Sequence, residues 1–220
     1  CLNRMRLTYR PSTIFGYDKQ LRKWVSPEWG QREIHTITKS DVFDLIFKKV
    51  EAKLSPHTRK SILKNTKRIF EMAVEEGILE RNPCVGIKLK VPEVEQMVLT
   101  NEEVHIFLRE AKITNHRFYP MWTMALMTGM RSGELFALRW TDIDLEGRTI
   151  SVSKQWTSKG GFGPTKTQRT RIVPISDDLL SFLREYKLEN RGDGVHVLPH
   201  LNEWKVGEQA KVTREFCEAI

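Results

Sequence analysis

One arginine stands in an unusual place, in the stretch TGMRSGELFALRW at positions 128–140. Arg131 falls in a turn between two apolar segments of helical character, and Glu134 follows three residues later. A half-buried arginine is costly unless it has a partner. Either Glu134 pairs with Arg131 as a structural ion pair, or the guanidinium is presented to bind an anion. Arginine suits phosphate because it stays charged and donates two parallel hydrogen bonds.

A second basic segment, PTKTQRTRIVPI, occupies positions 164–175. Lys166 follows a glycine-rich turn and is expected in a strand, with Arg169 and Arg171 beside it. A lysine on a hairpin can enter a phosphate site and donate a proton to a leaving oxygen. Hairpins often carry lysine, so this segment is informative only together with Arg131.

Basic residues also gather on one face of a helix predicted at 55–76. Their spacings of four, seven and eight place them together, and the apolar residues lie opposite. Such a face suits the phosphates of DNA, although a plain solvated face is an equally good interpretation. The residues predicted to contact DNA are Arg59, Lys60, Lys64, Lys67 and Arg68 on this helix, and Arg169 and Arg171 in the second basic segment.

Composition bounds the classes of partner. The 220 residues have a net charge of +8 and a pI near 9.4, which favours a polyanion such as nucleic acid. Cys1, Cys84 and Cys217 are far apart and odd in number, so neither a disulfide framework nor a metal site is expected. A reducing, cytoplasmic compartment fits best. The chain has no apolar run of about 18 residues, so no membrane span is expected.

The elements that must position these residues are mostly helical at first. Ser55 and Pro56 are typical of a helix start, and Gly77 of a helix end. Thr100 with Glu103 predicts a capping box that opens another helix. The helices expected in this half span 9–25, 38–54, 55–76 and 100–111, with a linker at 92–99 where helical periodicity fails.

The rest of the chain mixes helices with short strands. An apolar stretch at 119–130 predicts a helix buried nearly all round, and a further helix begins at 132. The strands expected are 149–156 and 170–175, joined through a glycine-rich turn at 159–163, and helices are expected at 176–190 and 205–220. The predicted fold class is mainly α with a small antiparallel β-sheet, an α+β arrangement after a helical N-terminal domain.

Taken in order, the two segments carry a family pattern. T-G-x-R-x-x-E-L-x-x-L followed by T-K-T-x-x-x-x-R-x-V-P-I resembles the tyrosine recombinases, the phage-integrase family. Trp140, followed by Asp142, Ile143 and Asp144, matches the family's W-x-D-I-D continuation. The resemblance implies a helical, SAM-like core-binding domain at 1–91, a linker at 92–99 and a catalytic domain at 100–220 that is incomplete at its C-terminus.

The resemblance also implies a reaction. Family members recombine or integrate double-stranded DNA by cleaving and rejoining strands through a 3′-phosphotyrosine, without metal or cofactor. By position, Arg131 would neutralise the scissile phosphate, Lys166 would be the general acid, and Glu134 would steady the site. The resemblance further implies a mobile element or prophage as the source, and a protein associated with the bacterial nucleoid. A homotetramer on synapsed DNA is expected of the full-length protein, and a monomer of this chain.

The sequence departs from the family in one respect. None of the six histidines begins the family's H-x-x-R motif, and all four tyrosines precede the nucleophile's expected position. We therefore expect the second arginine, the histidine and the nucleophilic tyrosine beyond Ile220, and no cleavage by this chain alone. The alternatives are a non-catalytic DNA-binding protein on a recombinase scaffold, a type IB topoisomerase relative, which the short core-binding domain disfavours, and an accidental match.

Overall fold

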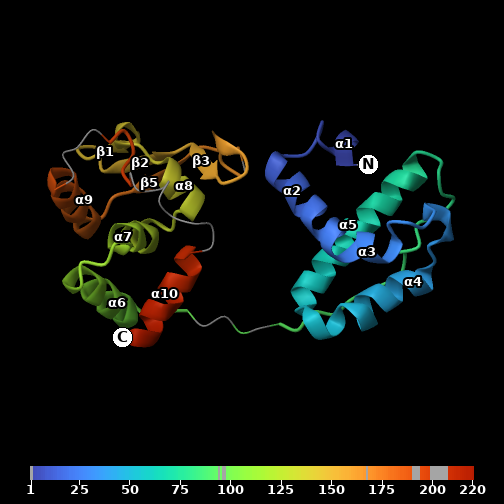
Figure 1. Ribbon diagram of the computed structural model, residues 1–220. Coiled ribbons are helices and arrows are strands. Elements are labelled where there is room, and N and C mark those ends of the chain that lie inside the picture. The colour runs from blue at the N-terminus through green and yellow to red at the C-terminus, as the bar shows by residue number, and fades with distance from the viewer. Residues whose placement is uncertain (1, 94, 96–97, 167, 190–193, 199–207) are drawn as a thin grey trace. The chain divides into compact units, whose positions relative to one another are not determined.

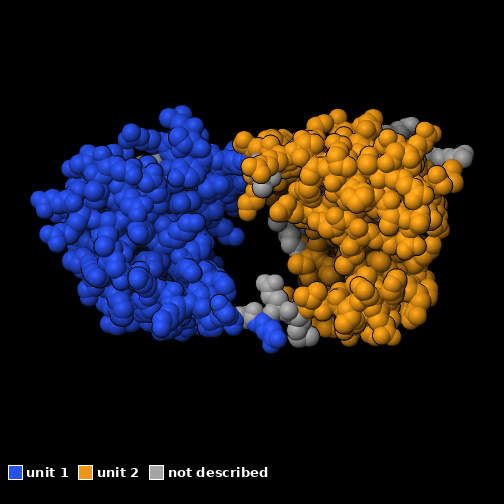
Figure 2. All heavy atoms as spheres, turned by 180° about the vertical axis from the view of Figure 1, so that it is seen from behind, with its two compact units in different colours: residues 1–96 blue, residues 97–220 orange. Residues whose placement is uncertain are grey.

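The computed structural model describes residues 2–93, 95, 98–166, 168–189, 194–198 and 208–220 (Figure 1). The chain divides into two compact units, unit 1 (Cys1–Gln96) and unit 2 (Met97–Ile220), which Figure 2 colours separately. The boundary between the units falls inside the segment 92–99. Each unit is described by itself.

All the regular secondary structure in the described part of unit 1 is helical. The predicted helix at 9–25 is an α-helix continued by a wider π-helical turn, and the one at 38–54 breaks up in the same way after Asp44. Its elements are α1 (Leu2–Met5), α2 (Pro11–Gln20), η1 (Leu21–Val25), α3 (Ser26–Trp29), η2 (Ile34–Thr36), α4 (Lys39–Asp44), η3 (Leu45–Lys49), η4 (Glu51–Lys53) and α5 (Pro56–Glu75).

Helix α5 forms the centre of unit 1, and its ends follow the sequence signals. The Ser55 side chain accepts a hydrogen bond from the Thr58 N–H at 3.3 Å, and Pro56 opens the helix. Gly77 follows with φ +72°, a left-handed conformation that glycine adopts without strain. The core to which α5 contributes consists of Trp29, Ile37, Val42, Leu45, Ile46, Val50, Ile62, Leu63, Phe70 and Cys84.

Unit 2 holds the helices α6 (Asn101–Ile113), α7 (Tyr119–Thr128), α8 (Ser132–Ala137), η5 (Trp140–Asp142), α9 (Asp177–Glu189) and α10 (Glu208–Ala219). The predicted capping box is present: the Thr100 N–H donates to Glu103 at 2.7 Å, and the Glu103 N–H donates to the Thr100 hydroxyl at 3.2 Å. Residues 205–207 of the predicted last helix lie outside the described residues.

The strands form two small antiparallel sheets where the sequence predicted one. The three-stranded sheet has the order β1 (Ile143–Asp144), β2 (Thr149–Val152) and β5 (Arg171–Pro174), and the two-stranded sheet pairs β3 (Lys154–Thr157) with β4 (Gly161–Pro164). The predicted strand at 149–156 breaks at Ser153, and the glycine-rich segment expected as a turn supplies most of β4. The fold class, mainly α with small antiparallel sheets, is confirmed.

The core of unit 2 gathers around α7. Trp122 packs on Phe107 of α6 and on Phe216 of α10, and its indole N–H donates to the Thr213 hydroxyl at 3.0 Å. The prediction that this segment is buried nearly all round is wrong at its C-terminal end, where Leu126 and Met127 are exposed because nothing in the described part of unit 2 covers them. Within the described residues, no helix is long and apolar enough to cross a membrane.

Candidate active site and nucleic-acid interface

Glu134 is the buried centre of a charged cluster in unit 2. It lies in the first turn of α8, and its side chain is only 1% exposed. The carboxylate accepts the Arg131 backbone N–H at 2.9 Å and one Arg131 guanidinium N–H, from Nη1 to Oε1, at 3.2 Å. The Arg131 side chain remains 62% exposed. The ion pair with Glu134 is therefore present, and it leaves the rest of the guanidinium exposed to solvent.

Arg171 is the principal partner of Glu134. Its Nη1 donates to Oε1 at 3.0 Å and its Nη2 to Oε2 at 2.7 Å, which is the parallel two-bond geometry of an arginine–carboxylate pair. These bonds are the main reason that the pKa of Glu134 falls from 4.5 to about 2, with the bonds from Arg131 adding to them and burial opposing them. Glu134 in turn raises the pKa of Arg171. The side chain that the sequence assigned to DNA thus holds the buried carboxylate.

Two glycines fix α8 in place. Gly129 ends α7 with φ +62° and donates its N–H to the Ala125 carbonyl at 3.0 Å, so the chain turns sharply before Arg131. Gly133 packs directly on β3, since a Cβ at this position would lie 2.7 Å from the Trp156 carbonyl oxygen. Gly133 was not among the residues predicted from the sequence. A second glycine just inside a predicted helix, where it costs stability, was the signal that could have revealed this contact.

Lys166 lies in an exposed turn between β4 and β5, so the prediction of a strand here is wrong. Pro164 is the last residue of β4, and the ladder ends there because proline lacks an N–H to continue it. The Gln168 N–H donates to the Thr165 carbonyl and the Thr165 hydroxyl to the Arg169 carbonyl, both at 3.0 Å. These two hydrogen bonds therefore hold the ends of the turn that contains Lys166.

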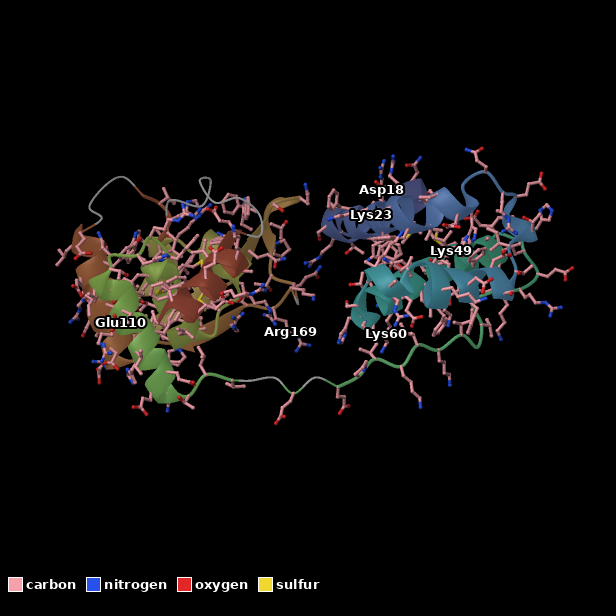
Figure 3. The ribbon with its side chains drawn as sticks, turned by 60° about the horizontal axis from the view of Figure 1, so that its bottom comes forward. Asp18, Lys23, Lys49, Lys60, Glu110 and Arg169 are labelled. Carbon is pink, nitrogen blue, oxygen red and sulfur yellow. The ribbon has the colours of Figure 1, made fainter. Side chains whose placement is uncertain are left out.

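Lys166 and Arg169 lie on this turn or directly after it, at exposed positions. Both side chains are exposed, and neither forms an ion pair with another described residue. Figure 3 shows Arg169 extending away from the ribbon of unit 2. Thr167, the second threonine of the T-K-T motif, lies outside the described residues.

The basic face of α5 is present, but its members differ. Lys60, Lys64 and Lys67 are exposed, whereas Arg68 is half-buried and donates to Glu75 at 2.8 Å. Lys67 approaches Glu71 at 3.8 Å. Lys60, labelled in Figure 3, and Lys64 have no ion pair with any described residue. These two lysines are therefore the strongest candidates on α5 for contacting an anion.

Arg59 is a correction to the predicted DNA-contacting set. It is buried, and its Nη1 donates to Glu51 at 2.9 Å and to the Ile46 carbonyl at 3.4 Å. Position 59 lies three and four residues before Ile62 and Leu63, which face the core of unit 1, so its side chain points inward with them. Arg59 therefore has a structural role within unit 1.

The charge of the chain is concentrated in unit 1. Residues 1–96 hold 19 Lys and Arg against 12 Asp and Glu, a net charge of +7. Residues 97–220 hold 17 against 16, a net charge of +1. The excess that favours a polyanionic partner therefore belongs almost entirely to the helical unit.

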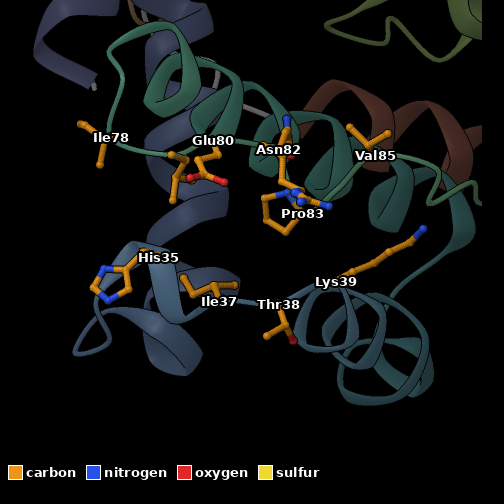
Figure 4. Close-up of a pocket in the computed structure, with 11 residues that line it drawn as sticks. His35, Ile37, Thr38, Lys39, Ile78, Glu80, Asn82, Pro83 and Val85 are labelled. Carbon is orange, nitrogen blue, oxygen red and sulfur yellow. The ribbon is translucent and has the colours of Figure 1, made fainter.

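Unit 1 also has a groove of about 670 Å³ (Figure 4). Figure 4 shows the segment with His35 and Lys39 on one side of the groove, facing the segment with Glu80 and Asn82. The groove shares no residue with the basic face of α5. Its lining consists of His35, Ile37, Thr38, Lys39, Ile78, Leu79, Glu80, Arg81, Asn82, Pro83 and Val85.

Sequence profiles of two related families match the chain in the same order as its units. The profile of the phage integrase central domain matches residues 3–90, and that of the phage integrase family matches residues 97–201. The chain belongs to the phage integrase family of tyrosine recombinases. Arg131, Glu134, Lys166 and Arg171 all fall within the second match.

Individual relatives agree with this assignment. A XerC-like tyrosine recombinase from Caldanaerobacter subterraneus is 30% identical over 208 residues, which are 85% of this chain and 53% of the relative. The ICEBs1 integrase of Bacillus subtilis is 31% identical over 172 residues, 76% of this chain and 47% of the relative. The chain thus spans about half the length of the curated relatives that it matches.

A solved structure shows the same fold. The chain superposes on a lambda integrase tetramer bound to a Holliday junction with a TM-score of 0.77 and 17% sequence identity, covering 99% of this chain and 64% of the lambda chain. At this identity the likeness shows the fold alone.

Proposed function

We propose that this chain is part of a site-specific DNA recombinase that cleaves and rejoins strands through a 3′-phosphotyrosine, with the tyrosine supplied by a part of the protein outside these residues. Unit 1 would hold duplex DNA, and unit 2 would contribute part of the catalytic site. The reaction proposed requires neither a metal nor a nucleotide cofactor.

Arg131 carries this proposal. Its guanidinium is attached at one edge to the buried carboxylate of Glu134, yet 62% of the side chain is exposed. An arginine held in one orientation and open to solvent can donate to the non-bridging oxygens of a phosphate as negative charge builds on them. Because Arg171 also binds Glu134, the carboxylate keeps its charge and its position when Arg131 binds a phosphate.

Lys166 is proposed as the general acid. Its position in an exposed turn, free of ion pairs with described residues, leaves its ammonium group available to a departing 5′-oxygen. Arg169 on the same turn and the lysines of α5 would contact the phosphate backbone. As in the lambda integrase tetramer on a Holliday junction, the full-length protein would act as a tetramer on paired DNA sites.

Covalent trapping tests the cleavage proposal. The full-length protein is incubated with end-labelled fragments of the DNA that flanks its gene, denatured in SDS and separated by electrophoresis. We expect a labelled protein–DNA complex that a protease removes. Arg131→Ala should reduce its rate of formation by about 10²–10³-fold, as the loss of one transition-state donor does. Cleavage at the normal rate by Arg131→Ala would exclude this role.

A further outcome of the same assay would favour the other function. If the full-length protein binds these fragments but never forms a covalent complex, it is a DNA-binding protein on a recombinase scaffold. Arg131 would then hold a phosphate without breaking the strand.

The salt dependence of binding tests the role of unit 1. The present chain is titrated with a fluorescent duplex of about 30 base pairs at several salt concentrations. Replacing both Lys60 and Lys64 with alanine should reduce the slope of log K against log salt by about 2, since each phosphate contact contributes about 0.9. Arg68→Ala is the matched control, because Arg68 is already paired with Glu75. Equal slopes for the wild type and the double variant would show that the face is merely solvated.

A further inference from the structure

The β3–β4 hairpin is held against the rest of unit 2 through both of its strands. On β3, the Trp156 main chain contacts α8 at Gly133, and the Trp156 ring meets Phe136 edge-on, with centroids 6.2 Å apart. On β4, Phe162 lies directly opposite Trp156 in the antiparallel ladder. Directly opposed residues have their side chains on the same face of the ladder, so the two rings emerge together.

Phe162 stacks on His196. The ring centroids are 5.3 Å apart and the planes are inclined by 14°. Burial, with Arg139 nearby, lowers the pKa of His196, so a neutral ring faces Phe162 at pH 7. His196 Nε2 is buried without a hydrogen-bond partner among the described residues, so no polar contact of that nitrogen orients the ring. Phe162 is nevertheless 53% exposed, which means that its contact with His196 is not part of the main core.

The segment that carries His196 is itself bound to the end of α8. The Val197 N–H donates to the Leu138 carbonyl at 3.0 Å, and the Trp140 N–H donates to the Val195 carbonyl at 3.1 Å. Both attachments of the hairpin therefore lead to the same helix, directly at Gly133 and through this segment at Leu138. Arg131 stands at the start of that helix.

The path from Phe162 to Lys166 is short and constrained. Pro164, opposite Lys154, is the last paired residue of β4. Thr165 is buried and its hydroxyl closes the turn that contains Lys166. The paired Pro164 and the buried Thr165 leave the intervening backbone little freedom, so a displacement of Phe162 would also displace Lys166.

We propose that Phe162 and His196 form a ring clamp that positions Lys166, relative to Arg131, for proton donation. The proposal rests on the proposed function and adds two positioning residues to it. In the cleavage step, the tyrosine hydroxyl releases its proton to solvent, its oxygen forms a bond to phosphorus, and the bond from phosphorus to the 5′-oxygen breaks. The proton that Lys166 gives up goes to that oxygen, and the lysine is left as a neutral amine.

Substrates with sulfur in place of the bridging 5′-oxygen test the clamp. A thiolate leaves without needing a proton because a thiol is far more acidic than an alcohol, with a pKa of about 8.5 for cysteine. Misplacing the general acid should therefore slow cleavage of ordinary DNA and spare the sulfur substrate. The experiment measures single-turnover cleavage of both substrates by the full-length protein, on the duplex that gives a covalent complex.

We expect Phe162→Ala and His196→Ala each to slow cleavage of the oxygen substrate by about 10- to 100-fold, as misplacement of a catalytic group does. Cleavage of the sulfur substrate should change by less than about 3-fold, because it bypasses the proton transfer. His196→Phe, which keeps a flat ring for stacking, should cleave the oxygen substrate at nearly the normal rate. Ile113→Ala, at a 70% exposed position on α6, is the matched control and should change neither rate.

Lys166→Ala separates this inference from the proposed function. If Lys166→Ala cleaves the sulfur substrate as slowly as the oxygen substrate, the general-acid role is wrong and the proposed function fails at that residue. If Lys166→Ala is rescued while Phe162→Ala is equally slow on both substrates, the clamp is a structural contact only and the inference is overturned. Normal rates for Phe162→Ala on both substrates, or a slow His196→Phe on the oxygen substrate, also overturn it.

Discussion

Replacing Glu134 with glutamine keeps the shape of the side chain and removes its charge. The pKa of Glu134 is lowered from 4.5 to about 2, chiefly by the hydrogen bonds from Arg171. At about 1.4 kcal/mol for each tenfold change in proton affinity, the folded state favours the ionised form by roughly 3 kcal/mol. Glu134 is 1% exposed, so solvent screens this interaction little. We therefore expect Glu134→Gln to reduce the free energy of unfolding by roughly 2–4 kcal/mol at pH 7.

The pH dependence of this loss has a definite sign. A carboxyl whose pKa is depressed in the folded state stabilises the protein above its unfolded pKa, and this contribution disappears as the pH falls through the folded pKa. The difference in stability between the wild type and Glu134→Gln should thus be constant above pH 4.5 and shrink toward pH 2. Asp41 and Glu103 also have lowered pKa values, but they titrate equally in both proteins and cancel in the difference.

Urea unfolding of this chain, followed by tryptophan fluorescence and circular dichroism between pH 2.5 and 7, measures the difference. Glu185→Gln is the matched control, because Glu185 forms an exposed ion pair with Lys112 and should change stability by less than about 1 kcal/mol. A loss below about 0.5 kcal/mol for Glu134→Gln, or a loss that does not vary with pH, would show that the charge of Glu134 does not stabilise the fold.

Three other perturbations have defined outcomes. Gly133→Ala should lower the free energy of unfolding by about 1–3 kcal/mol in the same urea assay, because the new methyl group would lie 2.7 Å from the Trp156 carbonyl oxygen; unchanged stability would mean that α8 is free to shift. Burial raises the pKa of Cys84 to about 12, so at pH 8 iodoacetamide should modify the exposed Cys217 well before Cys84 in peptide mass mapping, and equal rates would contradict the burial. Arg59→Ala should destabilise the chain by roughly 1–3 kcal/mol and leave the salt slope of DNA binding unchanged, whereas a smaller slope would return Arg59 to the DNA-contacting set.

Local signals in the sequence predicted most of the helix starts. Ser55 with Pro56, and Thr100 with Glu103, are caps whose hydrogen bonds form within a single turn, so tertiary context hardly affects them. The π-helical turn η3, which follows Asp44, had no such signal. The division of one predicted strand between two sheets depends on packing against α8, which the order of residues alone does not determine.

The candidate site could be predicted in its residue types but only partly in its contacts. Arg131 and Glu134 lie three residues apart, so their contact followed from helix geometry. The partnership of Arg171 with Glu134 joins residues 37 positions apart. One clue was available in the strand. Arg171 lies two residues before Val173, so both side chains point to the same, buried face, while Ile172 between them faces solvent. Arg59 was misjudged because a long cation can lie beside the core when a carboxylate such as Glu51 reaches it.

The last strand of the three-stranded sheet has a consequence for solubility. In the described part of the chain β5 lies at the edge of its sheet, where unpaired main-chain groups could recruit a strand from another molecule. Ile172, 60% exposed on that strand, would favour such pairing. Pro174 removes one hydrogen-bond donor from the edge. Arg171 places an inward-pointing charge on the same strand, paired with Glu134, and a strand from another molecule that covered this charge would pay a high cost. The ion pair that orders the candidate site therefore also protects this edge from aggregation.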